Sequence, residues 1–326
     1  MNGITPPVIN LSNAEMSCTT FANNPDLISC THIAEDIKTC QETYGKTILL
    51  SLGGATYSQG GWPSAADAQN AAELVWNMFG PQDNANVDRP FEDAVVDGFD
   101  FDFESTINNL PAFGAKLRSL MDAAIDKTYY LSAAPQCVFP DAALSTTLDT
   151  VAFDLVMVQF YNNGCQVSNF QSISTIQSAF NIDVWDKWAK GSANPDVKVL
   201  LGIPANVGAA GTGYTSGTHL QTAIAYAKQY SNFGGVMMWD MSQLNANTGY
   251  LAQIVSDLKH SGDTSDITIS TSAATTTTTS TFGSSSTGSS LITQWGQCGG
   301  EGYTGPTQCR PPYTCVFGGH YWSSCM

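Results

Sequence analysis

The stretch DGFDFDFES, residues 97–105, alternates acidic and aromatic side chains. Four carboxylates fall within eight positions of a chain that is only 12% charged: Asp97, Asp100, Asp102 and Glu104. Successive side chains of a β-strand point to opposite faces, so Asp100, Asp102 and Glu104 would share one face and the phenylalanines the other. The pattern therefore predicts a strand with one acidic face and one apolar face.

The flanking sequence alternates short β-prone runs with longer amphipathic stretches, which is typical of parallel βα units. The expected strands are Thr47–Gly54, Val95–Phe103, Tyr129–Pro135, Asp154–Tyr161, Val197–Pro204 and Gly234–Trp239. The expected helices are Ala65–Phe79, Leu110–Ile125, Thr218–Tyr230 and Tyr250–Leu258. These runs predict an α/β fold with six strands, whereas a closed (β/α) barrel has eight.

The two faces of the acidic strand suit different surroundings in a barrel. The outward face packs under helices, which fits Phe99, Phe101 and Phe103, and the acids then point inward, toward the C-terminal mouth where barrel enzymes carry their active sites. Carboxylates two positions apart on a strand lie about 6 to 7 Å apart, so they cannot all ionise cheaply in a partly desolvated interior. We expect at least one to hold a proton at neutral pH. Glu104, nearest the mouth, is the natural donor to the leaving oxygen of a glycosidic bond.

Two other interpretations of the acidic residues are weaker. A Ca²⁺ loop needs turn-forming glycines and backbone carbonyls, whereas bulky phenylalanines separate these acids and favour a strand. On spacing alone, the exposed polar face of an edge strand remains an alternative.

The composition limits the class of partner and the compartment. The 326 residues are 43% hydrophobic, enough for a sizeable core. A net charge of −16 opposes binding to nucleic acid or to an anionic membrane surface, and a neutral carbohydrate suits it better. Nine cysteines in a chain rich in Thr, Ser and Gly indicate a secreted protein, although the first residues lack the pattern of an export signal.

A change of composition divides the chain into three parts. Residues 1–262 form the expected body. Residues 263–290 are nearly all Ser, Thr and Gly, and we expect them to be a flexible, O-glycosylated linker between the body and a tail. The tail, residues 291–326, packs four cysteines and many aromatics into a segment too short for a hydrophobic core of its own. Four cysteines allow three pairings, which spacing alone does not resolve.

Further motifs follow the acidic strand in a consistent order. SLGG at 51–54, YLSAAPQC at 130–137, VQFYNN at 158–163 and GGVMMW at 234–239 accompany the DxxDxDxE pattern of residues 97–104. Together they resemble glycoside hydrolase family 18, and within it the plant and fungal class III chitinases. The resemblance covers essentially the whole body and implies a TIM barrel.

The same resemblance implies a role for individual residues in cleaving β-1,4-linked N-acetylglucosamine with retention of configuration. Glu104 would be the general acid and base, while the acetamido oxygen of the substrate would attack the anomeric carbon. Asp102 would orient the acetamido group, Asp100 would share a proton with it, and Tyr161 would donate a hydrogen bond to the acetamido oxygen. Further substrate contacts would come from Gly53, Gly54, Gln159, Asn162 and Trp239.

The tail resembles the fungal family 1 carbohydrate-binding module along its full length. Trp295, Tyr321 and Trp322 match the flat row of aromatics that stacks on a β-1,4-linked polysaccharide, chitin and cellulose alike. Gly319 and Ser324 depart from the Asn and Gln that are common in that module, which puts polar contacts to the sugar in doubt.

The two resemblances also imply a set of disulfides. The expected pairs are Cys18–Cys30, Cys137–Cys165, Cys298–Cys315 and Cys309–Cys325. Cys40 is left over, because its partner in the family lies near the first strand. NGITPPVINLS, residues 2–12, resembles the loop after the second strand of class III chitinases. We therefore expect a TIM barrel that lacks its first two strands as given, from an N-terminally truncated version of a secreted enzyme.

These expectations combine into an endo-acting chitinase anchored to chitin or cellulose by its tail. We expect no cofactor, no metal, no nucleic-acid or membrane partner, and a monomer. Two alternatives are an endo-β-N-acetylglucosaminidase acting on N-glycans, and a chitin-binding lectin-like protein without turnover. The tail argues against the first, and the presence of Glu104 argues against the second.

Overall fold

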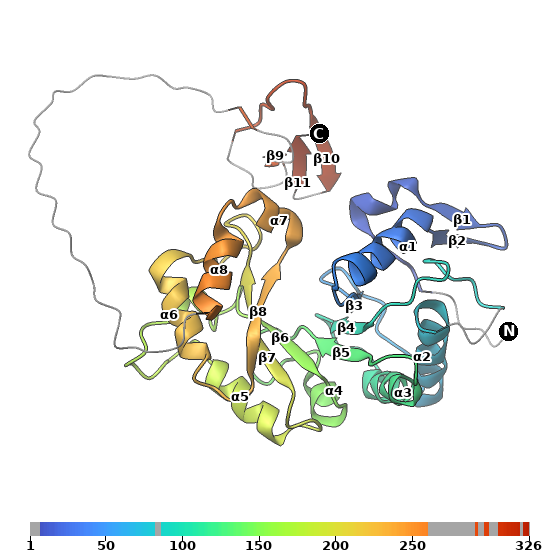
Figure 1. Ribbon diagram of the computed structural model, residues 1–326, viewed down its shortest axis with the longest axis horizontal. Helices are drawn as coiled ribbons and strands as arrows, with labels where there is room; N and C mark the ends of the chain where they lie inside the picture. The colour runs from blue at the N-terminus through green and yellow to red at the C-terminus, as the bar shows by residue number, and fades with distance from the viewer. Residues whose placement is uncertain are drawn as a thin grey trace, which may run out of the picture. The chain divides into compact units, whose positions relative to one another are not determined.

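The computed structural model describes residues 7–81, 86–259, 291–292, 297–299, 306–319 and 322–325. The chain divides into two compact units, Met1–Asp266 and Ile267–Met326 (Figure 1). The expected linker, residues 263–290, lies outside the described residues. Each unit is considered by itself below.

The first unit is built on one parallel sheet whose strands follow in chain order. The strands are β3 (Leu49–Gly53), β4 (Gly98–Asp102), β5 (Tyr130–Ala133), β6 (Leu155–Gln159), β7 (Lys198–Pro204) and β8 (Phe233–Trp239). Each of the six predicted strands contains or overlaps one of them, so the prediction of six parallel strands is confirmed. Within the described residues the sheet is not closed: β3 pairs only with β4, and β8 only with β7.

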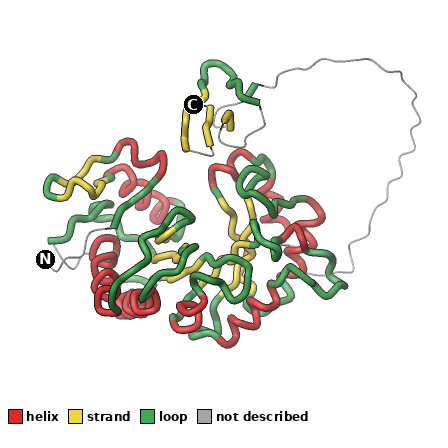
Figure 2. The backbone as a smooth tube through the Cα atoms, turned by 180° about the vertical axis from the view of Figure 1, so that it is seen from behind, coloured by secondary structure: helices red, strands yellow, loops and turns green. Residues whose placement is uncertain are grey.

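Helices precede, connect and follow the strands and lie on the outer side of the sheet (Figure 2). They are α1 (Thr31–Lys38), α2 (Ala65–Phe79), α3 (Leu110–Ala123), α4 (Ser145–Thr150), α5 (Ile182–Gly191), α6 (Gly217–Ala227), α7 (Met241–Ala246) and α8 (Tyr250–Lys259). The four predicted helices correspond to α2, α3, α6 and α8. The sequence prediction missed the other four and an antiparallel hairpin of β1 (Thr19–Phe21) and β2 (Asn24–Ser29). None of the helices in the described ranges has the length and apolar character to cross a membrane.

Phe99 and Phe101 of β4 face the helices, as predicted, and Phe103 directly follows the strand. Phe99 and Phe101 are fully buried, and Phe103 is nearly so. The Phe101 ring lies 5.7 Å from the ring of Phe113 on α3, and the Phe99 ring lies 6.4 Å from that of Trp76 on α2. This packing anchors β4 under its helices and leaves its acidic face pointing the other way.

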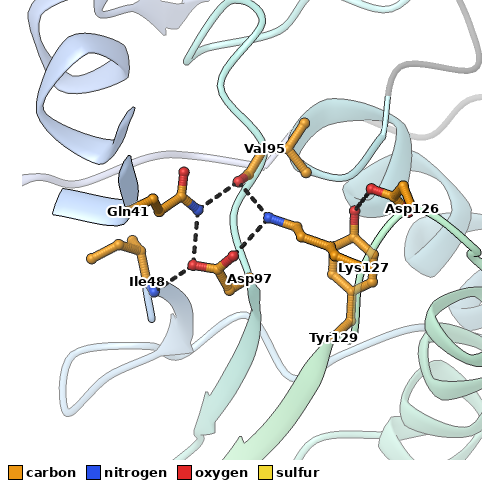
Figure 3. Close-up of polar contacts among 7 residues, drawn as sticks. All are labelled: Gln41, Ile48, Val95, Asp97, Asp126, Lys127 and Tyr129. Carbon is orange, nitrogen blue, oxygen red and sulfur yellow. Dashed lines mark hydrogen bonds and ion pairs between the residues drawn. The ribbon is translucent and has the colours of Figure 1, made fainter. Parts of the chain in front are cut away.

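Asp97 ties together the N-terminal ends of three strands (Figure 3). Its carboxylate accepts hydrogen bonds from Gln41 Nε2 at 2.8 Å, Ile48 N at 2.8 Å and Lys127 Nζ at 2.7 Å. Ile48 precedes β3, Asp97 precedes β4, and Lys127 lies shortly before β5. Burial works against the charged form, but these donors together lower the pKa of Asp97 below its ordinary value. The first acid of the motif is therefore part of the scaffold, at the opposite end of β4 from Glu104.

Two disulfides reinforce the first unit. Cys18 is bonded to Cys30 beside the hairpin, and Cys137 to Cys165 in the loops that follow β5 and β6. Both are pairs that the resemblance implied. Cys40 has a free thiol, also as expected.

The second unit is a small antiparallel sheet in the order β10 (Cys315–Gly319), β11 (Trp322–Cys325) and β9 (Gln297–Gly299). Disulfides join Cys298 to Cys315 and Cys309 to Cys325, again the implied pairs. Trp295, Tyr321 and the side chain of Trp322 lie outside what the structure describes, so their proposed stacking role stays a prediction.

Candidate active site

The innermost acid of the row is Asp100, which is held between two serines. Ser51 Oγ on β3 donates to one carboxylate oxygen at 2.8 Å, and Ser132 Oγ on β5 donates to the other at 2.7 Å. The register places Ser51, Asp100 and Ser132 side by side across the three strands. Burial raises the pKa of Asp100, although both hydroxyl donors oppose the change.

Asp102 lies one step nearer the mouth of the sheet and is less enclosed. Gln159 Nε2, at the end of β6, donates to Asp102 Oδ1 at 3.0 Å and to the Ala134 carbonyl at 2.9 Å. Burial, followed by the charges of Asp100 and Glu104, raises the pKa of Asp102 to about 7. The pKa values of Asp100 and Asp102 are thus both shifted in the direction that the expected proton within the acidic row requires.

Glu104 lies two residues beyond β4, which ends at Asp102 and not at Phe103 as predicted. The strand ends there because its partner β3 ends at Gly53, opposite Asp102. Gln159 Nε2 also approaches Glu104 Oε1, at 3.5 Å. One amide group at the end of β6 thus lies against both outer acids, nearer to Asp102 than to Glu104.

Gly53 and Gly54 hold the end of β3 against β4. Gly53 has a φ of +107°, and a Cβ atom there would lie 2.8 Å from the Asp102 carbonyl oxygen. Gly54 N donates to that same oxygen at 2.7 Å. The structure therefore gives the two glycines a close backbone approach to the acidic strand, and their predicted contact with substrate stays a prediction.

Tyr161 follows β6 and is held by the loop between β7 and α6. Asn162 adopts a left-handed φ of 58°, its backbone N donates to the Thr212 carbonyl at 3.1 Å, and its side-chain oxygen accepts from Thr212 N at 3.0 Å. A Cβ atom on Gly213 would lie 2.8 Å from Tyr161 Cα, so this loop passes close beneath the tyrosine. Asn162 was predicted to contact substrate, and the structure shows its side-chain oxygen bonded to the loop that supports Tyr161.

A cavity of about 480 Å³ opens at the C-terminal ends of the strands and gathers most of the predicted residues. Its lining includes Asp100, Asp102, Glu104, Gln159, Tyr161, Asn162 and Trp239. Burial and the nearby acids raise the pKa of Tyr161, which keeps its hydroxyl a donor. Trp239, at the end of β8, is 50% exposed and supplies an apolar wall. Asp97 is absent from this lining.

Comparison with known proteins agrees with this geometry. The profile of glycosyl hydrolases family 18 matches residues 8–217, which is more than half of the chain. The chain belongs to glycosyl hydrolase family 18. The family's fold is a TIM barrel, so the open parallel sheet contains six of the strands of that architecture. A second profile, the fungal cellulose binding domain, matches residues 294–322.

Several relatives of this family 18 hydrolase are fungal proteins. Endochitinase 33 of Trichoderma harzianum is 56% identical over 260 residues, covering 79% of this chain and 80% of that protein. A class III chitinase of Arthroderma benhamiae is 51% identical over 252 residues, covering 76% of each chain.

Solved structures share the fold. A xylanase and α-amylase inhibitor protein from Scadoxus multiflorus has a TM-score of 0.60 and 30% identity, covering 73% of this chain and 86% of its own. A chitinase from Ipomoea carnea has a TM-score of 0.56 and 29% identity, covering 70% and 79%. Because an inhibitor and a chitinase share this architecture, the fold alone does not assign an activity.

Sequence reasoning missed the residues that surround the acids. Ser51 and Gln136 line the cavity, and Ser132 bonds the innermost acid. The sequence held no signal for the two serines, because their alignment with Asp100 depends on the register between separate strands. Gln136 follows β5 in a loop, where no periodicity indicates the direction of a side chain.

Proposed function

We propose that this family 18 hydrolase cleaves β-1,4 bonds between N-acetylglucosamine residues within chitin chains. The observation that carries the proposal is one cavity holding Asp100, Asp102, Glu104 and Tyr161 beside the exposed Trp239. The fungal relatives named as chitinases support the choice of substrate.

Glu104 acts as the proton donor in the first step. It protonates the oxygen of the scissile bond while the acetamido oxygen of the bound sugar attacks the anomeric carbon. The bond from that carbon to the leaving oxygen breaks, and a cyclic oxazolinium ion forms on the substrate. In the second step the Glu104 carboxylate takes a proton from water as the water oxygen attacks the anomeric carbon. The acetamide is regenerated, and two inversions leave the β configuration.

Asp102 and Tyr161 support the attacking acetamido group. Asp102 accepts a hydrogen bond from the acetamido N–H and balances the positive charge of the ring intermediate. Because their pKa values are raised, Asp100 and Asp102 hold a proton between them while the substrate is neutral. As positive charge develops on the substrate, the proton moves toward Asp100 and Asp102 becomes negatively charged. Tyr161 donates to the acetamido oxygen, and Trp239 packs against an apolar face of the sugar.

The second unit serves as an anchor to the insoluble polysaccharide. The match to the fungal cellulose binding domain supports this role and favours chitin or cellulose over an N-glycan as the attached surface. We assign residues 1–262 to the hydrolase, 263–290 to a linker and 291–326 to the module. Four disulfides in the chain favour an oxidising, extracellular location.

The proposal is tested by the hydrolysis of a labelled, soluble chitin oligomer by the whole chain and by its Glu104→Gln variant. Loss of the general acid should lower the rate by about 10²- to 10⁴-fold. A matched control, Glu73→Gln, removes a surface carboxylate that pairs with Lys116 and should leave the rate unchanged.

Equal rates for the wild-type chain and Glu104→Gln would contradict the mechanism. Release of N-glycans from a glycoprotein without cleavage of the oligomer would favour the endo-β-N-acetylglucosaminidase. Binding of the oligomer without turnover by the wild-type chain would favour the lectin-like alternative.

A further inference from the structure

The hydroxyl of Tyr161 is not tied to the rest of the chain, although its side chain is buried. Within the part of the chain that the structure describes, this hydroxyl makes no hydrogen bond, and the residue lines the main cavity. The backbone on either side of the ring is fixed: Phe160 N donates to the Gly202 carbonyl of β7 at 2.9 Å, and the Tyr161 carbonyl accepts from Asn163 Nδ2 at 3.4 Å. The direction of the hydroxyl therefore depends on how this short piece of backbone is held.

Asn162 joins the same backbone to the loop that follows β7, residues 205–216. Its φ of 58° lies in the left-handed region, which asparagine adopts more readily than most residues. In this conformation its backbone N donates to the Thr212 carbonyl at 3.1 Å, and its side-chain Oδ1 accepts from Thr212 N at 3.0 Å. Asn162 thus binds both backbone groups of one residue across from it.

The loop also lies directly against Tyr161 at Gly213, which is buried. Gly213 has a φ of +106°, and a Cβ atom there would lie 2.8 Å from Tyr161 Cα and 2.9 Å from its Cβ. A Cβ atom on Gly211 would lie 3.3 Å from Asn162 Oδ1. The two glycines therefore allow the loop to approach both the tyrosine and the residue after it.

The loop is itself fastened at both ends to the segment around the start of α8. Asn247 Nδ2 donates to the Ala205 carbonyl at 2.9 Å and to the Tyr214 hydroxyl at 3.0 Å. Tyr250 on α8 donates from its hydroxyl to the Thr215 carbonyl at 2.9 Å. Because its ends are fixed in this way, the loop can act as a support for the residues that it contacts.

We propose that Asn162 is a positioning residue, which holds the Tyr161 hydroxyl in the direction that the reaction requires through its paired bonds to Thr212. The inference rests on the proposed function, which makes Tyr161 the donor to the acetamido oxygen. A displacement on the order of 1 Å is enough to slow a reaction about 10²-fold, so a hydroxyl with no bond of its own to the chain depends strongly on this support. The alternative role for Asn162 is the direct contact with substrate that the resemblance implied.

The two roles of Asn162 differ when the Tyr161 hydroxyl is absent. If Asn162 acts through that hydroxyl, its substitution should slow a chain that carries the hydroxyl and should have no further effect in the Tyr161→Phe background. If Asn162 binds the sugar itself, its substitution should slow both chains by the same factor. A double-mutant cycle therefore separates positioning from direct binding.

The test measures kcat and KM on a labelled, soluble chitin oligomer for whole chains with and without Tyr161→Phe. Asn162→Ala should lower kcat by at least about tenfold in the wild-type background and by less than about twofold in the Tyr161→Phe background, with KM nearly unchanged in both. Gly213→Ala, which presses on Tyr161 from a position outside the cavity lining, should show the same dependence on background. Asn169→Ala removes an exposed side-chain bond to the Gly164 carbonyl in the same connection, and as the matched control it should leave kcat unchanged.

Equal losses of kcat in the two backgrounds would overturn the inference and favour direct binding of the sugar by Asn162. An unchanged kcat in folded Asn162→Ala would also overturn it, while a slow Tyr161→Phe variant would leave the proposed function standing. If Tyr161→Phe cleaves as fast as the wild-type chain, the proposed role of Tyr161 fails and the inference fails with it. If Asn162→Ala does not fold, as judged by circular dichroism, Asn162→Gly decides the outcome, because glycine keeps the left-handed conformation and lacks the acceptor.

Discussion

Asp100 and Asp102 occupy alternate positions of one strand but have different surroundings. Two serine hydroxyls hold Asp100 in the interior, while Asp102 faces the cavity and shares the Gln159 amide with Glu104. The spacing of the acids was enough to predict that protonation would be perturbed. It could not show that burial is the largest cause, because burial depends on β3 and β5 on either side.

The raised pKa of Asp102 predicts how its contribution to stability changes with pH. The pKa of an ordinary Asp is about 4, and that of Asp102 in the folded chain is about 7. Between these two pH values the folded chain holds a proton that the unfolded chain releases. Its contribution to the free energy of unfolding is therefore present below about pH 4 and is lost as the pH rises to about 7. The difference in unfolding free energy between wild type and Asp102→Asn should fall across this window by an amount on the order of 3 kcal/mol.

Urea unfolding at pH values from 4 to 8 measures this difference. Asp196→Asn, at an exposed position, is the control and should follow the wild type throughout. A constant difference between wild type and Asp102→Asn across the window would contradict the assignment.

At the scale of elements, the close approach of β3 to β4 sets the position of the acids. Gly53→Ala would place a methyl group 2.8 Å from the Asp102 carbonyl oxygen, whereas Gly54→Ala would meet nothing within 4 Å. Both glycines have positive φ, so both substitutions carry backbone strain. The difference in stability between the two variants therefore reports the contact of the added methyl group with the Asp102 backbone. Gly53→Ala should destabilise the chain by about 1–3 kcal/mol more than Gly54→Ala.

Gly53→Ala should also slow cleavage of a chitin oligomer more than Gly54→Ala does, because only the first displaces the backbone of Asp102. Urea unfolding and initial rates on the same preparations measure the two effects. Equal stability and equal rates for the two variants would show that β3 does not determine the position of Asp102.

The bonds around Asp97 fix the other end of the same three strands. Asp97→Ala would remove the side-chain acceptor of Ile48 N and one of two acceptors of Gln41 and Lys127, which keep the Val95 carbonyl. It should lower the free energy of unfolding by about 1–3 kcal/mol. Asp93→Ala, which breaks the exposed pair with Lys38, should cause no measurable change. Urea unfolding compares the two, and similar losses for both would contradict a scaffold role for Asp97.

The strands could be predicted because each is a short β-prone run between longer amphipathic stretches. The α5 helix was missed although Ile182, Trp185 and Ala189, at helical spacing, are all buried, so its periodic signal was present. The β1–β2 hairpin offered no comparable alternation, and the Cys18–Cys30 bond lies beside it. The serines around Asp100 depend on register between strands far apart in the sequence, which no local pattern contains.

At the scale of the whole molecule, hydrolysis and attachment are assigned to separate units. Replacing both Trp295 and Trp322 by alanine should weaken adsorption to insoluble chitin by about tenfold or more, because the proposed stacking on the sugar rings would be lost. Rates on a soluble oligomer should not change. Sedimentation with chitin and oligomer hydrolysis measure the two properties, and Arg310→Ala in the same unit is the control. Undiminished adsorption of the tryptophan variant would contradict the anchoring role.

The cavity should fluctuate most where it is lined by the two edge strands of the sheet. Ser51 on β3 and Trp239 on β8 line the cavity from the two strands that have one neighbour each among the described residues, while Asp100 and Asp102 belong to β4, which is bonded on both sides. Segments with fewer partners open locally at a lower free energy than the centre of a sheet. We therefore expect brief openings to begin at the rim of the site and to leave the spacing of Asp100 and Asp102 intact. Such a cavity can widen around a polymer while its reactive centre keeps its shape.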